Sequence, residues 1–348
     1  MNKSILVFLL LFETITGCVD EIKLSQDAKE AKLIVDGTIT NAVGPYTVTL
    51  NYSLPYTEAG ITQSISGARV SIVEVGGKTA NFTELSTGIY QTDSAAIRGQ
   101  VGKAYFLKIR LGNGREYQSK PETILPPVPV DSFKVAFIPD IKNKKPFILS
   151  VKTKDPVEKG NFYRWKWTHY DTVSICKNSY TVTEGGRFNY KTFCCQKCWQ
   201  IEPCVGCINI ASDALTNGRL IESDIAQLPF ESKKPYFIVL EQYSISSEYY
   251  QFWKSVGTQI NNSGGIFDNA PAQIQGNLFN INNSEEQVLG YFAASGVSLK
   301  PIYVPRNVIG FSARPPLELA NFDVIYQPDC APCRGISRTP NKPLGWVE

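Results

Sequence analysis

The chain has 348 residues and a formal net charge of +3, from 35 Lys and Arg against 32 Asp and Glu. This balance, with no extended basic tract, argues against nucleic acid as a partner. The single histidine, His169, excludes zinc sites that need two or three histidines, and no GxGxxG, P-loop or HExxH motif occurs. Aromatic residues make up 11% of the chain and, with many Thr, Val and Ile, favour a β-rich fold.

The first residues predict export and lipidation. Lys3 precedes a continuous apolar run, Ile5–Phe12, which is shorter than the roughly 20 residues that a membrane-spanning helix needs. It therefore indicates a signal peptide over residues 1–17. The sequence ITGC that ends at Cys18 resembles the bacterial lipobox, so we expect cleavage before Cys18 and its lipidation, which would anchor the chain to a lipid bilayer. A plain secretory signal and a buried N-terminal strand are the alternatives.

Residues 18–31 are polar and are expected to form a tether between the lipid and the first domain. Gly- and Asn-rich turns then separate a series of short β-like runs. No helical period lies between them, which predicts an Ig-like or carboxypeptidase-regulatory-like β-sandwich over residues 32–120. The expected strands of this sandwich are 32–40, 46–52, 68–75, 89–92 and 104–111, with a hairpin at Gly112-Asn113-Gly114.

Residues 121–131 carry four prolines and predict a stiff linker. A larger β-rich domain with a cysteine-rich insertion is expected over 132–348, with strands near 132–138, 147–152, 161–175 and 234–244. In the third of these, aromatic residues and His169 recur at every second position, so they share one face of the strand. We interpret His169 as the end of a half-buried stripe rather than as a catalytic or ligand residue. The stripe is Tyr163, Trp165, Trp167 and His169.

One helix is predicted over about 247–262. Ser247 is the expected N-cap, and Glu248 suits the positive end of the helix dipole. Apolar residues at helical spacing form one face, which we expect to pack on the core. Asn and Gly residues after 260 would end the helix. The apolar face comprises Tyr249, Phe252, Trp253, Val256 and Ile260.

Residues 267–297 read FDNAPAQIQGNLFNINNSEEQVLGYFAASGV. This run resembles the domain-of-unknown-function family 4249 of Bacteroidota. The similarity extends to a strand and proline linker such as Ser119–Val130, to the cysteines of 194–207 and to a C-terminal CxxC at 330–333. The resemblance implies lipoproteins with an N-terminal β-sandwich and a larger β-rich domain. It implies no enzymatic activity, and the genes of such proteins commonly lie beside those of TonB-dependent outer-membrane receptors.

Two features of that run have ordinary structural interpretations. GNLFNINN is expected to be a turn and a strand edge, without assigned chemistry. The adjacent carboxylates Glu285 and Glu286 are expected to be a solvated turn, or a helix start capped by Ser284, rather than a glycosidase pair.

Eight cysteines remain after Cys18. An even number in an exported chain favours disulfides, and we expect Cys330 or Cys333 to pair back to the central cluster. Zinc held by CxxC pairs is the competing hypothesis, and thioredoxin-like redox chemistry is the third, although FCCQKCWQ shows no helix start. We expect no metal and no cofactor. The eight are Cys176, Cys194, Cys195, Cys198, Cys204, Cys207, Cys330 and Cys333.

These observations favour a non-enzymatic lipoprotein of the outer membrane, exposed at the cell surface. The resemblance suggests an accessory subunit of a TonB-dependent β-barrel, in substrate capture or complex assembly. Trp199, Tyr52 and Tyr56 are candidate partner contacts, because aromatic residues often anchor interfaces; ordinary packing is the alternative. Two other hypotheses are an anchored glycan or peptide hydrolase built from Asp and Glu, and a stand-alone adhesin or glycan binder.

Overall fold

The computed structural model describes residues 31–53, 63–139, 146–182, 185–261, 274–308, 310–312, 324–327, 333 and 337–347. Cys18, Tyr56, Cys330 and the expected signal peptide lie outside these residues, and only the backbone of Cys194 is described. Strands dominate the described residues, as the sequence predicts, and α2 is the one helix among them.

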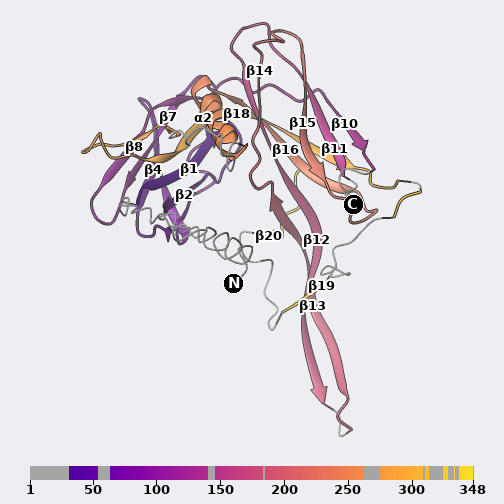
Figure 1. The fold of residues 1–348 in the computed structure, drawn as a ribbon. Coiled ribbons are helices and arrows are strands. Elements are labelled where there is room, and N and C mark those ends of the chain that lie inside the picture. Colours follow the sequence, from indigo (N-terminus) through magenta and orange to yellow (C-terminus); the bar gives the residue numbers. More distant parts are fainter. Residues whose placement is uncertain are drawn as a thin grey trace, which may run out of the picture.

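The first strands form a β-sandwich-like unit, which we call the N-terminal body (Figure 1). β1, β2 and β6 pair antiparallel in one sheet, and β4, β7 and β8 pair in another, while β5 pairs with both β4 and β6. The strands are β1 (Leu33–Thr40), β2 (Thr47–Tyr52), β3 (Gln63–Ser64), β4 (Arg69–Glu74), β5 (Thr79–Ser86), β6 (Ile89–Thr92), β7 (Ala104–Arg110), β8 (Glu116–Ser119) and β9 (Glu122–Thr123).

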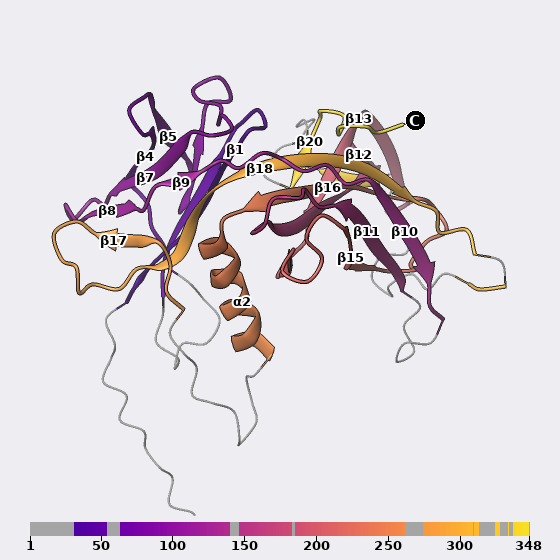
Figure 2. The ribbon, with the colours of Figure 1, turned by 90° about the horizontal axis from the view of Figure 1, so that it is seen from above.

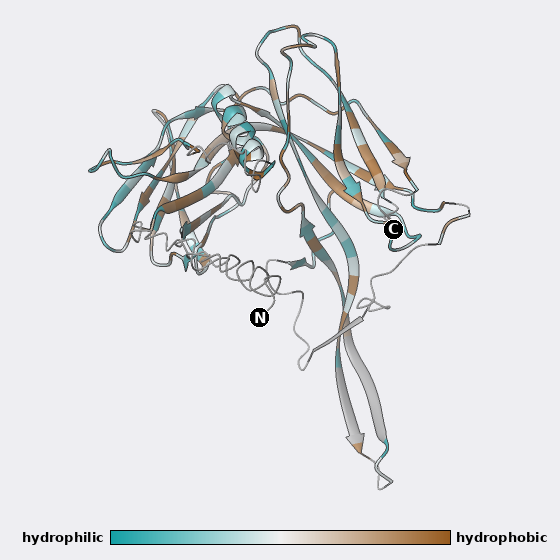
Figure 3. Cartoon of the chain, viewed as in Figure 1, coloured by the Kyte–Doolittle hydropathy of each residue, from teal (hydrophilic) through white to brown (hydrophobic). Residues whose placement is uncertain are grey.

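Alternating apolar residues explain why these segments form strands around one core. In β1, Leu33, Val35 and Ile39 are buried, whereas Asp36 is exposed, as a strand with one covered face requires. Figure 3 shows this alternation of apolar and polar residues along strands of the molecule. The main buried side chains of the N-terminal body are Leu33, Val35, Val48, Leu50, Ile72, Tyr90, Tyr105, Leu107, Tyr117 and Ile124.

The C-terminal body packs a three-stranded sheet, β10–β11–β15, against a second sheet of β14, β12, β16 and part of β18 (Figure 2). Its core includes Leu149, Val151, Trp165, Leu228, Ile238, Leu240 and Ile302. The remaining strands of the described residues, of which β17 pairs with the N-terminal body, are β10 (Ser132–Phe137), β11 (Phe147–Lys154), β12 (Phe162–Val182), β13 (Phe188–Pro203), β14 (Asn209–Ser212), β15 (Leu220–Leu228), β16 (Tyr236–Ile245), β17 (Leu278–Asn280), β18 (Leu289–Val304), β19 (Val324–Gln327) and β20 (Arg338–Thr339).

Strand β18 belongs to both bodies (Figure 2). It runs parallel to β1 from Ile34↔Leu289 to Thr40↔Ser295, and from Gly296 onward it pairs antiparallel with β16. β17 also pairs with β8 of the N-terminal body. The sandwich that the sequence places within residues 32–120 is therefore completed by strands from the C-terminal part of the chain.

The proline-rich segment 121–131 is packed against both bodies. Its β9 pairs with β7, and Ile124 lies in the core of the N-terminal body. Val130 lies in the core of the C-terminal body, and the Gln242 side chain donates a hydrogen bond to Val128 O at 2.8 Å. The segment thus connects the two bodies and contributes side chains to the cores of both.

The aromatic stripe on β12 faces the C-terminal core as predicted. Tyr163 and Trp165 are fully buried, and His169 is buried at the end of the stripe. The Trp165 indole donates to Gln242 Oε1 at 2.7 Å, which satisfies its polar atom. The His169 ring stacks on Tyr236, with centroids 3.7 Å apart, and its Nδ1 lies 2.7 Å from Phe237 O. This environment is that of a structural histidine.

We expect the stability of the protein to fall as the pH drops below about 6.5, the ordinary pKa of histidine. Burial lowers the pKa of His169, although its bond to Phe237 O and the nearby Glu202 and Asp171 act in the opposite direction. The unfolded chain then takes up a proton at higher pH than the native chain does. Between pH 6.5 and the lowered pKa, unfolding should become easier by up to about 1.4 kcal/mol per pH unit.

Urea denaturation of the wild type and of His169→Phe between pH 7.5 and about 5 measures this effect. The phenylalanine keeps a ring against Tyr236 but cannot take up a proton. Its pH curve should be flatter than that of the wild type, and the difference between the two curves removes contributions from carboxylates. Parallel curves would show that His169 does not titrate differently on folding.

Helix α2 (Ser247–Asn261) confirms the predicted helix, with one correction at its start. The N-cap is Ser246, whose hydroxyl accepts a hydrogen bond from Tyr249 N at 3.2 Å, whereas Ser247 bonds to Glu248. The predicted apolar face packs through Tyr249, which is buried, but Ile260 is exposed. No helix among the described residues is long and apolar enough to cross a membrane.

Candidate functional site

Strands β12 and β13 form a long hairpin that leaves the C-terminal body and projects away from both bodies (Figure 1). Their pairing begins at Thr168↔Pro203 and continues to Val182↔Phe188. We call residues 173–182 and 188–198 the arm. Two long paired strands outside a globular body form an extended surface, so the arm is the candidate interaction site.

Within the part of the chain that the structure describes, three disulfides lie in or beside the arm. Cys176–Cys195 links its two strands. Cys198–Cys333 ties it to the described residues of 324–347, which we call the C-terminal segment, as we expected for Cys330 or Cys333. Cys204–Cys207 closes a turn just after β13. Among the described residues, no group of three or more His, Cys, Asp or Glu side chains is placed to hold a metal ion.

The C-terminal segment covers both edges of the base of the arm. β19 runs parallel to β12 from Ser174↔Val324 to Lys177↔Gln327. β20 pairs antiparallel with β13 at Trp199 and Gln200. With the Cys198–Cys333 bond between them, these pairings fix the direction in which the arm leaves the body.

Trp199 is not an exposed contact residue, which corrects its prediction as a partner contact. Its side chain is only 7% exposed, and its ring packs edge-on against Trp346, with centroids 6.4 Å apart. Trp346 also packs on Phe237, at 5.0 Å. Tyr52 is partly buried against the core of the N-terminal body. Trp199 therefore packs against the C-terminal segment.

Gly276 and Asn277, in the run of 267–297, stabilise the N-terminal body by close contacts with other strands. The Asn277 side chain donates to Phe292 O at 2.8 Å and accepts from Phe292 N at 2.9 Å, as a neighbouring strand would. Its own carbonyl accepts a bond from Lys120 N at 2.8 Å. A Cβ on Gly276 would lie 1.8 Å from Gly290 O, so only glycine fits there. This part of the run has a structural role.

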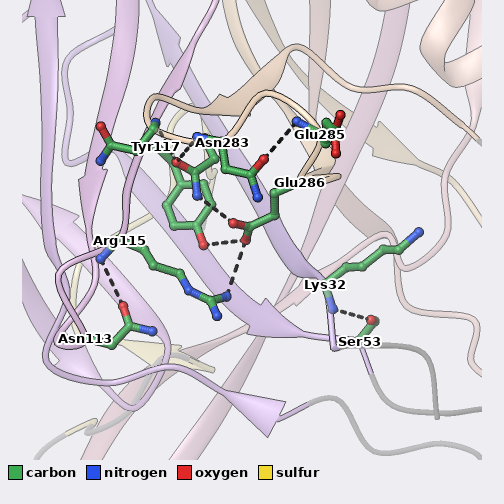
Figure 4. Close-up of polar contacts among 10 residues, drawn as sticks. Lys32, Ser53, Asn113, Arg115, Tyr117, Asn283, Glu285 and Glu286 are labelled. Carbon is green, nitrogen blue, oxygen red and sulfur yellow. Dashed lines mark hydrogen bonds and ion pairs between the residues drawn. The ribbon is translucent and has the colours of Figure 1, made fainter.

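Glu286 is the centre of a second polar cluster (Figure 4). Its carboxylate accepts hydrogen bonds from Tyr117 OH at 2.7 Å and from Asn280 Nδ2 at 2.5 Å, and Arg115 lies 3.5 Å away as an ion pair. Burial, followed by the bond to Glu286, raises the pKa of Tyr117. The cluster joins the turn after β17 to the hairpin of β7 and β8.

The two adjacent glutamates therefore have different roles. Glu285 is exposed, as expected for a solvated turn. The Glu286 side chain is 20% exposed and fully bonded, which the interpretation of the pair as a solvated turn or a helix start did not predict. Asn280 Oδ1 instead orders this turn by accepting bonds from Asn282 N and Asn283 N.

Glu286→Gln should lower the free energy of unfolding by about 1–3 kcal/mol, because the amide cannot accept from both Tyr117 and Asn280 and loses its charge. Glu285→Gln is the matched control, one residue away and exposed, and should change stability by less than about 0.5 kcal/mol. Urea denaturation of both variants measures the contrast. Equal effects would show that the cluster is not a stabilising unit.

A third polar network joins the two bodies. Arg164 of β12 is buried; it donates to Tyr249 OH at 2.8 Å, and its guanidinium carbon lies 3.7 Å from the centroid of the Trp253 ring. Tyr249 packs on Tyr291 of β18, which in turn donates to the Glu122 carboxylate of β9. Burial raises the pKa of Glu122, and the bond from Tyr291 acts against this.

Three buried carboxylates have structural partners among the described residues. Glu122 binds Tyr291 at the junction of the two bodies. Asp155 accepts from Tyr163 OH and from Gly218 N, and Asp213 accepts from Gly160 N. Each of these carboxylates holds a loop or a junction in place.

Comparison with known proteins gives one assignment. No curated protein sequence matches the chain. One family profile, described as domain of unknown function (DUF4249), matches residues 19–300. That range includes the N-terminal body, the C-terminal body as far as Lys300, the arm, and the Asn277 and Glu286 clusters. The chain therefore belongs to the DUF4249 family.

Proposed function

We infer that the protein is a non-enzymatic lipoprotein, anchored through Cys18 to the outer membrane at the cell surface. There it serves a TonB-dependent β-barrel as an accessory subunit, in substrate capture or complex assembly. The lipobox-like sequence before Cys18 and the disulfides, which form in oxidising compartments, support this location. Membership of the DUF4249 family supports the partner class through the resemblance described above.

The arm is the observation that carries the proposal. Beyond Lys177, its strands pair only with each other among the described residues, so their outer edges are available to another chain. Strand edges of this kind bind extended segments by main-chain hydrogen bonds. The disulfides and the C-terminal segment hold the base, so the arm can bind without first being ordered. A loop or strand end of a barrel is the partner surface that fits.

Affinity purification from detergent-solubilised outer membranes tests the proposal. The tagged full chain should recover a β-barrel receptor, identified by mass spectrometry. The matched control deletes residues 178–192 and joins the strands by a two-residue turn, which leaves the Cys176–Cys195 bond in place. This variant should be folded and membrane-bound but should lose the barrel.

Two outcomes would contradict the proposal. If the full chain were recovered without any barrel, the proposed partner would be wrong. If the shortened variant still recovered the barrel, the arm would not be the binding site. Cys18→Ser tests the anchor separately: the chain should no longer sediment with membranes or incorporate labelled fatty acid. Retained membrane attachment and labelling would place the anchor elsewhere.

A further inference from the structure

Among the disulfides of the described residues, Cys204–Cys207 is the one in which neither cysteine is buried. Cys198 and Cys333 are both buried, and in the Cys176–Cys195 bond Cys176 is buried whereas Cys195 is exposed. The Cys204–Cys207 bond closes a four-residue turn whose two central residues are fully on the surface. Both of its cysteines are partly exposed, so a thiol in solution can reach the bond. The exposed central residues are Val205, at 95%, and Gly206.

A backbone N–H of β12 donates a hydrogen bond to one of the two sulfurs. Cys204 N donates to Trp167 O at 2.9 Å and continues the β12–β13 ladder. Trp167 N then donates to Cys204 Sγ, at 3.4 Å, where a carbonyl oxygen would ordinarily accept. Cys207 Sγ accepts no such hydrogen bond from the described residues. A fixed N–H donor stabilises negative charge on sulfur, so Cys204 is the better leaving group of the pair.

We propose that Cys204–Cys207 is a reversible disulfide that exchanges electrons with a dithiol, an activity beyond that of a barrel subunit. A thiolate of the dithiol attacks Cys207 Sγ, and the electron pair of the broken S–S bond leaves on Cys204 Sγ. The second thiolate of the dithiol attacks its own sulfur in the mixed disulfide and releases Cys207. Two electrons pass to this protein, and its two thiolates take up the two protons that the dithiol lost.

This site needs no helix N-terminus, in contrast to thioredoxin-like chemistry. The donor is the strand N–H of Trp167, which the β12–β13 ladder holds in place. The exchange also leaves the arm intact, because Cys176–Cys195 and Cys198–Cys333 are separate bonds. The turn can therefore open and close without unfolding its surroundings.

Limiting dithiothreitol, added to the purified full chain in detergent, tests the proposal. Samples quenched with iodoacetamide at successive times are mapped by peptide mass spectrometry. Cys204 and Cys207 should be labelled together and at least about tenfold faster than Cys176–Cys195 or Cys198–Cys333, with an unchanged circular dichroism spectrum. Equal rates for all three bonds, or slower reduction of Cys204–Cys207, would overturn the proposal.

A second measurement tests the inequality of the two sulfurs. In Cys207→Ala the remaining Cys204 should react with iodoacetamide at a pH about one unit lower than Cys207 does in Cys204→Ala. Coincident profiles would overturn the role of the Trp167 donor. If either variant fails to fold, the reduction rates of the unmutated chain still decide whether the bond is selectively reducible.

Discussion

Gly290→Ala is expected to destabilise the protein by at least about 4 kcal/mol, or to prevent its accumulation. Gly290 lies at the start of β18 with φ +87°, a conformation that L side chains rarely adopt. A Cβ there would lie 1.9 Å from Val35 O, a backbone atom of β1. The clash can be relieved only if the two parallel strands separate, which would disturb the register Val35↔Gly290 and the strand that joins both bodies.

Gly102→Ala is the matched control for this prediction. Gly102 has nearly the same conformation, φ +82°, but an added Cβ would meet nothing within 4 Å. Its replacement should therefore lower the free energy of unfolding by only about 1–2 kcal/mol, which is the strain of placing an L residue in the left-handed conformation. Urea denaturation of both variants separates conformational strain from the β1–β18 contact. Similar losses in the two would mean that the sheet accommodates the methyl group and that the close approach of β1 and β18 is unimportant.

Local patterns predicted most strands because each has its own apolar period. The strand segments near 46–52, 104–111 and 234–244 all alternate or run apolar, and they form β2, β7 and β16. β5 was missed because, of its eight residues, only Ala80 is buried, so its pattern is mostly polar. The N-cap was misplaced by one position because two adjacent serines precede the helix, and only hydrogen-bond geometry distinguishes them.

Contacts between distant segments could not be predicted in the same way. The pairing of β18 with β1 joins residues 34 and 289, and nothing in either strand specifies a parallel partner so far along the chain. Trp199 looked like a surface aromatic because its cover, Trp346, lies near the C-terminus. The Glu286 cluster likewise depends on Tyr117, from a hairpin on the other side of the linker.

The cysteine pattern was more informative, because the number and compartment of the thiols favour cross-links without specifying pairs. The predicted return of the C-terminal CxxC to the central cluster corresponds to the Cys198–Cys333 bond. The pairing itself requires the fold, since β12 and β13 bring Cys176 opposite Cys195, with Cα atoms 4.0 Å apart. Spacing alone also could not reveal the strand N–H that points at Cys204.

Removing the Cys198–Cys333 bond, in the double variant Cys198→Ala with Cys333→Ala, should lower the free energy of unfolding by roughly 4–5 kcal/mol. The bond closes a loop across a sequence separation of 135, so its loss restores much conformational entropy to the unfolded chain. The C-terminal segment should also leave Trp199, because the pairing at β20 spans only two residues. Urea denaturation and the red shift of tryptophan fluorescence measure the two effects.

The double variant Cys176→Ala with Cys195→Ala is the matched control, since it removes the bond that lies beside Cys198–Cys333 in the same arm. Its loop spans a separation of only 19 residues, which corresponds to roughly 3 kcal/mol in the same treatment. It should also leave the tryptophan spectrum unchanged, because the contact between Trp199 and Trp346 does not depend on that bond. Suppose that the two double variants were equally stable and both kept the native spectrum. The contacts of β19, β20 and Trp346 would then hold the C-terminal segment in place without the Cys198–Cys333 bond. In that case strand pairing alone would fix the direction of the arm.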